Sequence, residues 1–202
     1  MMATATAADS QHSGAATRPG QLIVFTGPSG VGKGTLLRQL LQRHPEAKLS
    51  ISATTRAPRA GEVHGQHYYF VSPDTFDAMV TEGQLLEWAQ FAGNCYGTPR
   101  QPLEALIDEG HLVILEIELE GARQVRETFP RAKQIFVLPP SLEELELRLR
   151  QRGQDADSAL AKRLARARVE LAAADEFDIQ IVNDDLERAL EELELAVFGE
   201  QS

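Results

Sequence analysis

The segment at residues 27–35, G-P-S-G-V-G-K-G-T, constrains the fold more than any other part of this chain. It follows an apolar run at 21–26 that is typical of a β-strand, and it opens a helical pattern at 33–43. Glycines let successive backbone N–H groups turn toward one anion, and the N-terminus of the following helix adds a partial positive charge. The sequence therefore predicts a strand, a phosphate-binding loop and a helix.

This loop is expected to bind a polyphosphate through its backbone, with the ammonium group of Lys33 near the β- and γ-phosphates. The predicted phosphate-binding residues of the loop are Gly27, Pro28, Ser29, Gly30, Val31, Gly32, Lys33, Gly34 and Thr35. Gly34 stands where the common form of the loop has Ser or Thr, whose hydroxyl binds Mg²⁺. Thr35 is the nearest hydroxyl that could take over this role, so it is a candidate metal ligand.

Beyond the loop, strand patterns alternate with helical patterns, which is typical of a parallel sheet covered by helices. Further strands are predicted at 112–117, 133–138 and 178–182, and further helices at 101–109, 122–128, 142–150, 158–175 and 186–198. Residues 50–91 interrupt the alternation with a Tyr- and Phe-rich strand at 68–71, turn glycines and another strand at 85–91. The predicted fold is an α/β protein whose parallel-sheet core carries a small inserted β-rich lobe.

Length and charge limit the classes of function. The 202 residues suffice for one domain. The net charge is −10, with the acidic excess almost entirely after residue 168, which argues against a nucleic-acid partner. No apolar run approaches the ~20 residues of a membrane span, which argues against a membrane partner. The single Cys95, and residues 1–20 without a secretory pattern, favour a cytoplasmic protein with a disordered N-terminal tail.

Arg56 and Arg59 flank a proline in a turn-prone stretch. Their guanidinium groups can converge on one phosphate dianion, and Tyr68 can add a hydroxyl donor. His64 and His67 have no cluster of Cys, Asp or Glu beside them, so we assign no metal to them. The stretch predicts a second phosphate site, and it gains weight from the phosphate-binding loop upstream.

Glu87 stands inside the otherwise apolar run 85–91. An ionised carboxylate in such surroundings needs hydrogen-bond donors. A guanine ring offers its N1–H and its exocyclic amine side by side, so one carboxylate can accept both, and adenine lacks this pair. Glu87 is therefore a candidate for guanine recognition. A glutamate at a strand edge that faces water is the alternative.

Four motifs, in this order along the chain, resemble those of the guanylate kinase family, whose members transfer the γ-phosphoryl group of ATP to GMP. They are the phosphate-binding loop, S-x-S-A-T-T-R-x-P-R-x-G-E with the following Y-Y-F, E-W-A-Q-F-x-G-N-x-Y-G-T, and I-V-N-D-D-L. The resemblance covers residues 21–198. It implies a core sheet, a GMP-binding lobe and a helical lid that closes over the bound nucleotides.

The resemblance implies a role for each residue that matches the motifs. The residues expected to bind GMP are Ser52, Arg56, Arg59, Tyr68, Glu87, Tyr96, Gly97, Thr98 and Glu118. The residues expected to act in catalysis are Lys33, Arg56, Arg152 and Arg163, and Asn183 is expected near the adenine of ATP. Glu116 and Glu118 stand where many members have Asp, and Glu116 is expected near Mg²⁺ together with Thr35.

The same resemblance divides the chain into parts. The tail is expected at 1–20 and the guanylate kinase-like domain at 21–202, with its core at 21–50, 92–140 and 170–202. The GMP-binding lobe is expected at about 51–91 and the lid at about 141–169. We expect the lobe and the lid to move as hinged units, because two polyanions must meet where water is excluded.

Three other classes of function remain open. A non-catalytic guanylate kinase-like module would bind phosphopeptides, but such modules typically lack the loop lysine, which is present here as Lys33. A kinase for another phosphorylated small molecule would not need Glu87 and Ser52. A GTP-hydrolysing switch should carry N-K-x-D, which does not occur. The favoured function is therefore transfer from ATP to GMP or dGMP, with Mg²⁺ as the cofactor.

Overall fold

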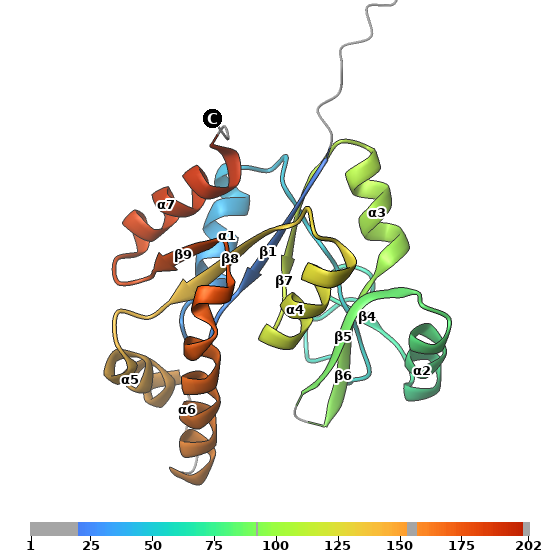
Figure 1. Cartoon of the computed structure of the whole chain (residues 1–202). Coiled ribbons are helices and arrows are strands. Elements are labelled where there is room, and N and C mark those ends of the chain that lie inside the picture. Colours follow the sequence, from blue (N-terminus) through green and yellow to red (C-terminus); the bar gives the residue numbers. More distant parts are fainter. Residues whose placement is uncertain (1–19, 92, 153–156, 200–202) are drawn as a thin grey trace, which may run out of the picture.

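The computed structural model describes residues 20–91, 93–152 and 157–199, so the predicted tail at 1–20 lies outside the described residues except for Gly20. The core of the described chain is a five-stranded parallel sheet in the order β2-β7-β1-β8-β9 (Figure 1). Its strands are β1 (Gln21–Thr26), β2 (Lys48–Leu49), β7 (Leu112–Glu116), β8 (Lys133–Leu138) and β9 (Ile179–Val182). The predicted parallel sheet is thereby confirmed.

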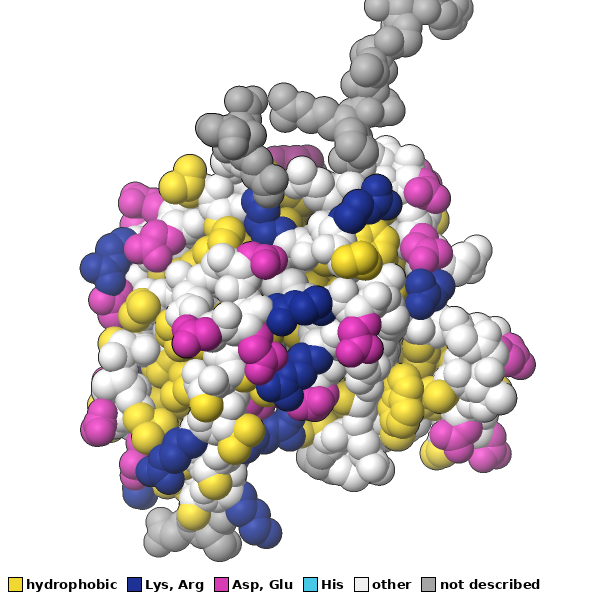
Figure 2. All heavy atoms as spheres, viewed as in Figure 1, with side chains coloured by type: hydrophobic (Ala, Val, Ile, Leu, Met, Phe, Trp, Pro, Cys, Tyr) yellow, Lys and Arg dark blue, Asp and Glu magenta, His cyan; other side chains and the backbone are white. Residues whose placement is uncertain are grey.

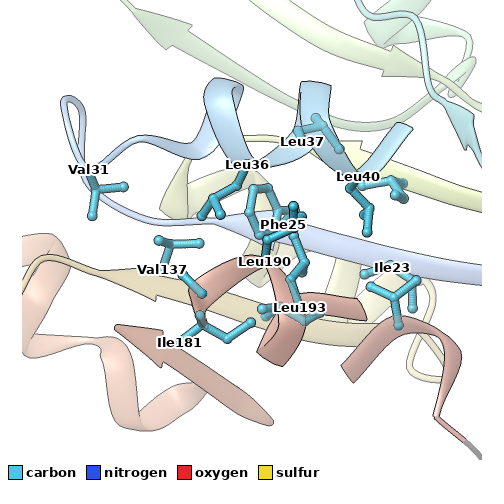
Figure 3. Packing of buried hydrophobic residues seen from close by; sticks show 14 of the residues in the cluster. Ile23, Phe25, Val31, Leu36, Leu37, Leu40, Val137, Ile181, Leu190 and Leu193 are labelled. Carbon is cyan, nitrogen blue, oxygen red and sulfur yellow. The ribbon is translucent and has the colours of Figure 1, made fainter. Parts of the chain in front are cut away.

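Helices cover both faces of this sheet because the side chains of a buried strand alternate between them. Ile23 and Phe25 of β1 pack toward α1 (Lys33–Arg43) and α7 (Leu186–Phe198), and Figure 3 shows side chains of both helices around Phe25. Leu22 and Val24 pack toward α3 (Arg100–Asp108) and α4 (Leu119–Thr128). The sheet therefore lies between two apolar layers, as its continuous run of apolar residues requires.

A second, four-stranded sheet has the order β4-β3-β6-β5. Its strands are β3 (Ala53–Thr54), β4 (Tyr69–Phe70), β5 (Leu85–Phe91) and β6 (Asn94–Pro99), and α2 (Pro73–Thr81) lies beside it (Figure 1). Because β6 pairs with β3 and β5, this sheet continues past residue 91, where the lobe was expected to end. The sequence does not predict β6 as a strand, because Gly97 and Pro99 are both unfavourable in strands. Pairing with the neighbouring strands stabilises them there.

The strand β5 contributes to two of the three hydrophobic clusters among the described residues. Leu85 packs with Ala53 and Phe76 in the cluster of the second sheet. The next residue, Leu86, points the other way and belongs to the cluster that lies under α4. Alternation along one strand thus anchors the inserted lobe to the core immediately before Glu87.

The segment predicted as a lid contains α5 (Leu142–Arg152) and α6 (Asp157–Ala172). Leu145 and Leu149 of α5, and Leu160 of α6, are buried in the cluster that contains Phe25. In this conformation both helices therefore pack against the core.

The ends of several elements differ from the prediction. The predicted helix at 158–175 stops at Ala172, and a short 3₁₀ helix, η1 (Ala174–Glu176), follows. The α-helix stops there because Ala173, Ala174 and Phe177 turn into the cluster under α4. The predicted helix at 122–128 is wrong at its start, since α4 begins at Leu119, and the unpredicted α2 begins at a Ser72 cap whose Oγ accepts from the N–H of Thr75 at 3.1 Å.

The surface carries interleaved charges. On the face drawn in Figure 2, basic and acidic side chains lie beside one another. Ion pairs such as Arg123–Glu176, at 2.6 Å between Nη2 and Oε1, account for such neighbours. Among the described residues, no helix combines the length and the apolar character needed to cross a bilayer.

Candidate active site

A cavity of about 390 Å³ lies between the phosphate-binding loop, the carboxyl end of β7 and the second sheet. In open α/β sheets this edge is where ligands bind. The residues that line it come from six separate stretches of the chain: Ser29, Gly30, Gly32, Lys33, Gly34, Ser52, Tyr68, Glu87, Ala89, Phe91, Tyr96, Gly97, Glu116, Ile117 and Glu118. Twelve of these fifteen positions were named from the sequence as site residues.

The loop has the backbone of an anion-binding turn. Gly32 has φ +106°, a left-handed conformation, and a Cβ there would lie 2.3 Å from Nδ2 of Asn183. Only glycine therefore fits this position. Gly32 is also the N-cap of α1, which has no side-chain cap and begins at Lys33. The open helix end thus contributes backbone N–H groups and a partial positive charge to the cavity.

Two cations lie at the loop. The Nζ of Lys33 donates to the carbonyl oxygens of Gly27, at 2.5 Å, and Pro28, at 3.2 Å. The Nη2 of Arg163, on α6, donates to Oγ of Ser29 at 3.1 Å. The structure thus brings one lysine and one arginine, 130 positions apart in the chain, to the same loop. A terminal phosphate at this loop would lie within reach of both charges.

Asn183 and Arg148 stabilise the phosphate-binding loop through hydrogen bonds to its backbone. The Nδ2 of Asn183 donates to the carbonyl oxygen of Val31 at 2.8 Å, and the side chain is buried. The Nη1 of Arg148 donates to the carbonyl oxygens of Asn183, at 3.0 Å, and Val31, at 3.3 Å, while Nε pairs with Glu144 at 2.9 Å. Sequence reasoning missed Arg148. Its signal in the sequence is its place in the same arginine-rich run as Arg152.

Arg56 is held by a carboxylate that the sequence analysis did not single out. Glu62 accepts from Nη1 and Nη2 of Arg56, both at 2.9 Å, and from the backbone N–H of Arg59 at 2.7 Å. These bonds lower the pKa of Glu62 to about 2. The guanidinium of Arg56 also lies over the ring of Tyr68, 5.4 Å from its centroid. Glu62 ends the S-x-S-A-T-T-R-x-P-R-x-G-E motif, which was its only signal in the sequence.

Glu87 is a buried carboxylate. It is 4% exposed, and its Oε1 accepts from Oγ1 of Thr98 at 2.6 Å. Burial raises its pKa to about 7, and the bond from Thr98 lowers it only in part. A Cβ on Gly121 would lie 2.4 Å from Oε2, so α4 gives this oxygen room only through a glycine. The alternative of a glutamate at a strand edge that faces water is therefore wrong.

Two more carboxylates lie at the end of β7. The side chain of Glu116 is exposed to the solvent of the cavity. Partial burial by the surrounding protein nevertheless raises its pKa, whereas the positive charge of Lys33 lowers it. Oε2 of Glu118 pairs with Nη2 of Arg166 at 3.2 Å. Arg166, on α6, also pairs with Glu170 at 2.8 Å and lies over the ring of Phe91, 4.7 Å from its centroid. An arginine of the predicted lid thus contacts both the cavity and the inserted lobe.

The remaining predicted residues lie behind the cavity wall or beside it. Those outside the lining are Gly27, Pro28, Val31, Thr35, Arg56, Arg59, Thr98, Arg163 and Asn183. Thr98 reaches the cavity through its bond to Glu87, and Arg56 through its contact with Tyr68. The backbone of Arg152 ends α5, and its side chain lies outside the described part of the structure.

A parallel sheet, a glycine-rich loop at a helix N-terminus and a cavity at its edge that contains the loop lysine define the class of phosphate-loop nucleotide-binding α/β proteins. The guanylate kinase family profile matches residues 19–200. Guanylate kinase from Thermosynechococcus vestitus is 68% identical over 185 residues, which are 92% of this chain and 97% of that protein. The guanylate kinase of Synechocystis sp. is 62% identical over 182 residues, with 90% and 95% covered.

Comparison with solved structures leads to the same family. The crystal structure of guanylate kinase from Anaplasma phagocytophilum superposes with a TM-score of 0.71 and 34% identity, over 88% of this chain and 84% of that one. This chain belongs to the guanylate kinase family. The resemblance found in the sequence motifs is therefore confirmed, and so is the predicted α/β fold class.

Proposed function

We propose that this chain transfers the γ-phosphoryl group of ATP to GMP, giving ADP and GDP, for purine nucleotide metabolism and GMP recycling. One observation carries the proposal: Lys33 of the phosphate-binding loop and the buried carboxylate of Glu87 line the same cavity. A polyphosphate and a guanine ring can therefore be held side by side in one cavity. Membership in the guanylate kinase family supports the same reaction.

GMP would bind across the second sheet. Its guanine ring would donate its N1–H and exocyclic amine to Glu87, with Ser52, Thr98 and Glu118 nearby. Its phosphate would contact Arg56, Arg59, Tyr68 and Tyr96, beside the backbone of Gly97. Arg56 now pairs with Glu62, which holds its fork in a defined orientation before the ligand arrives. dGMP shares the base and the phosphate, so it would be accepted as well.

ATP would bind with its phosphates on the loop at 27–35. Lys33 would move from the carbonyl oxygens that it now contacts to the β- and γ-phosphates. Asn183 would lie near the adenine, while its amide nitrogen keeps the loop in place. The phosphate of GMP is itself the nucleophile, so the protein contributes position and positive charge rather than a general base. Lys33, Arg56, Arg152 and Arg163 would supply that charge.

A magnesium ion fits the oxygen donors at this site. Mg²⁺ prefers one or two carboxylates together with substrate phosphates and water, rather than a cage made of protein alone. Glu116, which lines the cavity together with Lys33, would offer such an oxygen, and Thr35 would offer its hydroxyl from outside the lining. No group of three or more His, Cys, Asp or Glu that could hold a metal occurs among the described residues. When bound, the ion would neutralise charge on the β- and γ-phosphates.

The parts of the chain would divide this work. The lobe at about 51–91, together with β6, would hold GMP, and the lid at about 141–169 would close over the phosphates from the core at 21–50, 92–140 and 170–202. The free thiol of Cys95 is in keeping with a cytoplasmic enzyme. Its partners would be the two nucleotides, without nucleic acid or a membrane.

A coupled assay of ADP release tests the proposal. ATP and Mg²⁺ are offered with GMP, AMP, CMP or UMP, and we expect turnover with GMP to exceed that with the others by at least about a hundredfold in kcat/KM. Glu87→Gln should lose most of its turnover with GMP. Glu82→Gln, which changes an exposed carboxylate of the same lobe, is the matched control and should behave as the unaltered chain. Equal rates with AMP and GMP would refute the proposal.

A further inference from the structure

Gln124 of α4 holds the backbone next to Glu87. Its Nε2 donates to the carbonyl oxygen of Trp88 at 2.8 Å, and its Oε1 accepts from the backbone N–H of Trp88 at 3.1 Å. β5 is an edge strand of the second sheet, and Trp88 pairs with Gly97 of β6 on its inner side. On the outer side of β5, the side-chain amide of Gln124 therefore satisfies the backbone N–H and C=O groups of Trp88 that a further strand would otherwise pair with.

A second side chain of α4 acts on the other side of Glu87. Oγ1 of Thr128 donates to the carbonyl oxygen of Leu86 at 3.3 Å and to that of Gln124 at 2.9 Å. The carbonyl of Leu86 and the N–H of Trp88 belong to the two peptide groups that flank the Cα of Glu87. One helix thus holds the backbone on both sides of the buried carboxylate.

The sheet by itself does not fix this stretch of backbone. The register between β5 and β6 shifts between Leu85 and Trp88, so the ladder is irregular where Glu87 lies. α4 also provides Gly121, where a Cβ would lie 2.4 Å from Oε2 of Glu87. A small rotation of β5 would drive the carboxylate into this helix or withdraw it from the cavity, and displacements of about 1 Å strongly reduce the efficiency of such sites.

We infer that Gln124 is a specificity-determining positioning residue, which aims the carboxylate of Glu87 at the guanine ring of the acceptor nucleotide. The inference rests on the proposed function, because it takes GMP as the acceptor. Gln124 is absent from the cavity lining and acts through β5 rather than by touching the ligand. Its loss should therefore weaken GMP binding and reduce selectivity, and it should leave ATP binding and phosphoryl transfer intact.

Steady-state kinetics of Gln124→Leu test the inference. Leucine has a similar size and removes both hydrogen bonds to Trp88. We expect the KM for GMP to rise about tenfold, with kcat within about twofold and the KM for ATP unchanged. The ratio of kcat/KM for GMP to that for AMP should fall by a similar factor. Arg123→Gln is the matched control, since Arg123 lies on the same helix but pairs with Glu176 and Glu120.

A second variant and a direct binding measurement complete the test. Gln124→Glu keeps the acceptor for the N–H of Trp88, but it loses the donor and sets a carboxylate oxygen against the carbonyl oxygen of Trp88. It should therefore also raise the KM for GMP, and it decides the matter if Gln124→Leu does not fold. Trp88 is the single tryptophan of the chain, so its fluorescence reports GMP binding without turnover. The dissociation constant for GMP should rise with the KM.

The outcomes separate the two proposals. Unchanged KM and unchanged selectivity in both variants would overturn the inference, and so would a loss of kcat at constant KM, which is the result of a merely structural role. In both cases the unaltered chain still phosphorylates GMP, and the proposed function survives. Failure of the unaltered chain to bind or phosphorylate GMP would overturn the proposed function, and the inference with it.

Discussion

Glu87 combines burial with donors from one residue, the hydroxyl and the backbone of Thr98, and this has consequences at the scale of one residue. A carboxylate with only these donors is under-satisfied when it is ionised, because it can accept about four hydrogen bonds. Burial therefore raises its pKa to about 7, against an ordinary value of 4.5. The two N–H donors of guanine would supply what is missing, so binding of GMP should favour the ionised form and lower this pKa.

The affinity for GMP should accordingly depend on pH. Below about pH 7 the free carboxyl group is protonated and must lose its proton on binding, so the KM for GMP should rise as the pH falls from 8 to 6. The phosphate of GMP, with a second pKa of about 6, titrates over part of the same range. The profile of Glu87→Gln serves as the control, since it contains only the phosphate. Parallel profiles for the two proteins would contradict this assignment.

The stability of the folded protein should depend on pH in the opposite way, because protonation of Glu87 weakens GMP binding but favours folding. The folded protein binds a proton at Glu87 up to about pH 7, whereas the unfolded chain releases it near pH 4.5. The carboxyl group therefore does not penalise folding below pH 4.5. The penalty grows as the pH rises from about 4.5 to 7, and it stays constant above that. Urea unfolding at pH 5 and at pH 8 should show that the free energy of unfolding of Glu87→Gln, relative to the unaltered chain, is roughly 1–3 kcal/mol higher at pH 8 than at pH 5. If the two proteins differ by the same amount at both pH values, the raised pKa is contradicted.

At the scale of elements, α4 shapes the wall behind the proposed guanine site. Its third residue, Gly121, leaves room for the carboxylate of Glu87, and Gln124 and Thr128 bind the edge of β5. Leu119, Ala122 and Val125 bury the opposite side of the helix in the core. The same helix thus fixes the lobe to the sheet and sets the position of its buried acid.

Gly121→Ala separates helix stability from function. Alanine favours an α-helix by up to about 1 kcal/mol over glycine, so the helix itself should not suffer. The new Cβ would lie 2.4 Å from Oε2 of Glu87, so the carboxylate must move. We expect the KM for GMP to rise at least about tenfold in the coupled assay, with little change for ATP. Glu120→Ala, at an exposed position of the same helix, is the control, and equal KM values in both variants would contradict the prediction.

The elements that could be predicted are those with their own sequence signal. β1, β5, β8, α1 and α7 occur at the predicted residues because each shows a clear apolar pattern. The weak β6 and the two-residue β2 and β3 have no such pattern, since pairing with distant strands creates them. Helix α2 has a start signal at Ser72 and Pro73, but it lies within a β-rich stretch, so no helix was predicted there.

At the scale of the whole molecule, α6 contacts both sides of the cavity. Arg163 donates to Ser29 of the phosphate-binding loop, and Arg166 contacts Glu118 and Phe91 on the side of the lobe. Two nucleotides between these groups would replace some of these contacts with phosphate and base. The helix is therefore placed to respond to the occupancy of both proposed subsites.

Binding of both nucleotides should make the molecule more compact. Each ligand alone leaves one side of the cavity without its counter-charge, so closure should need GMP together with a non-hydrolysable ATP analogue. Small-angle X-ray scattering should show a smaller radius of gyration with both ligands than with either alone. Glu87→Gln with the same mixture is the control, and it should close less. An unchanged radius with both ligands would contradict hinged motion of the lobe and the lid.

The sequence by itself determined the phosphate-binding loop, the parallel α/β core and the family, because these depend on local spacing and on apolar periodicity. It also identified twelve of the residues that line the cavity. Only the tertiary structure decided that Arg148 and Asn183 fix the loop, that Glu62 orients Arg56, and that Gln124 holds the strand of Glu87. Most of these partners lie far apart in the chain or act through hydrogen bonds to backbone groups, so no local pattern of residue types reveals them. Glu62 and Arg56 are only six positions apart, but they pair through a turn that has no regular spacing.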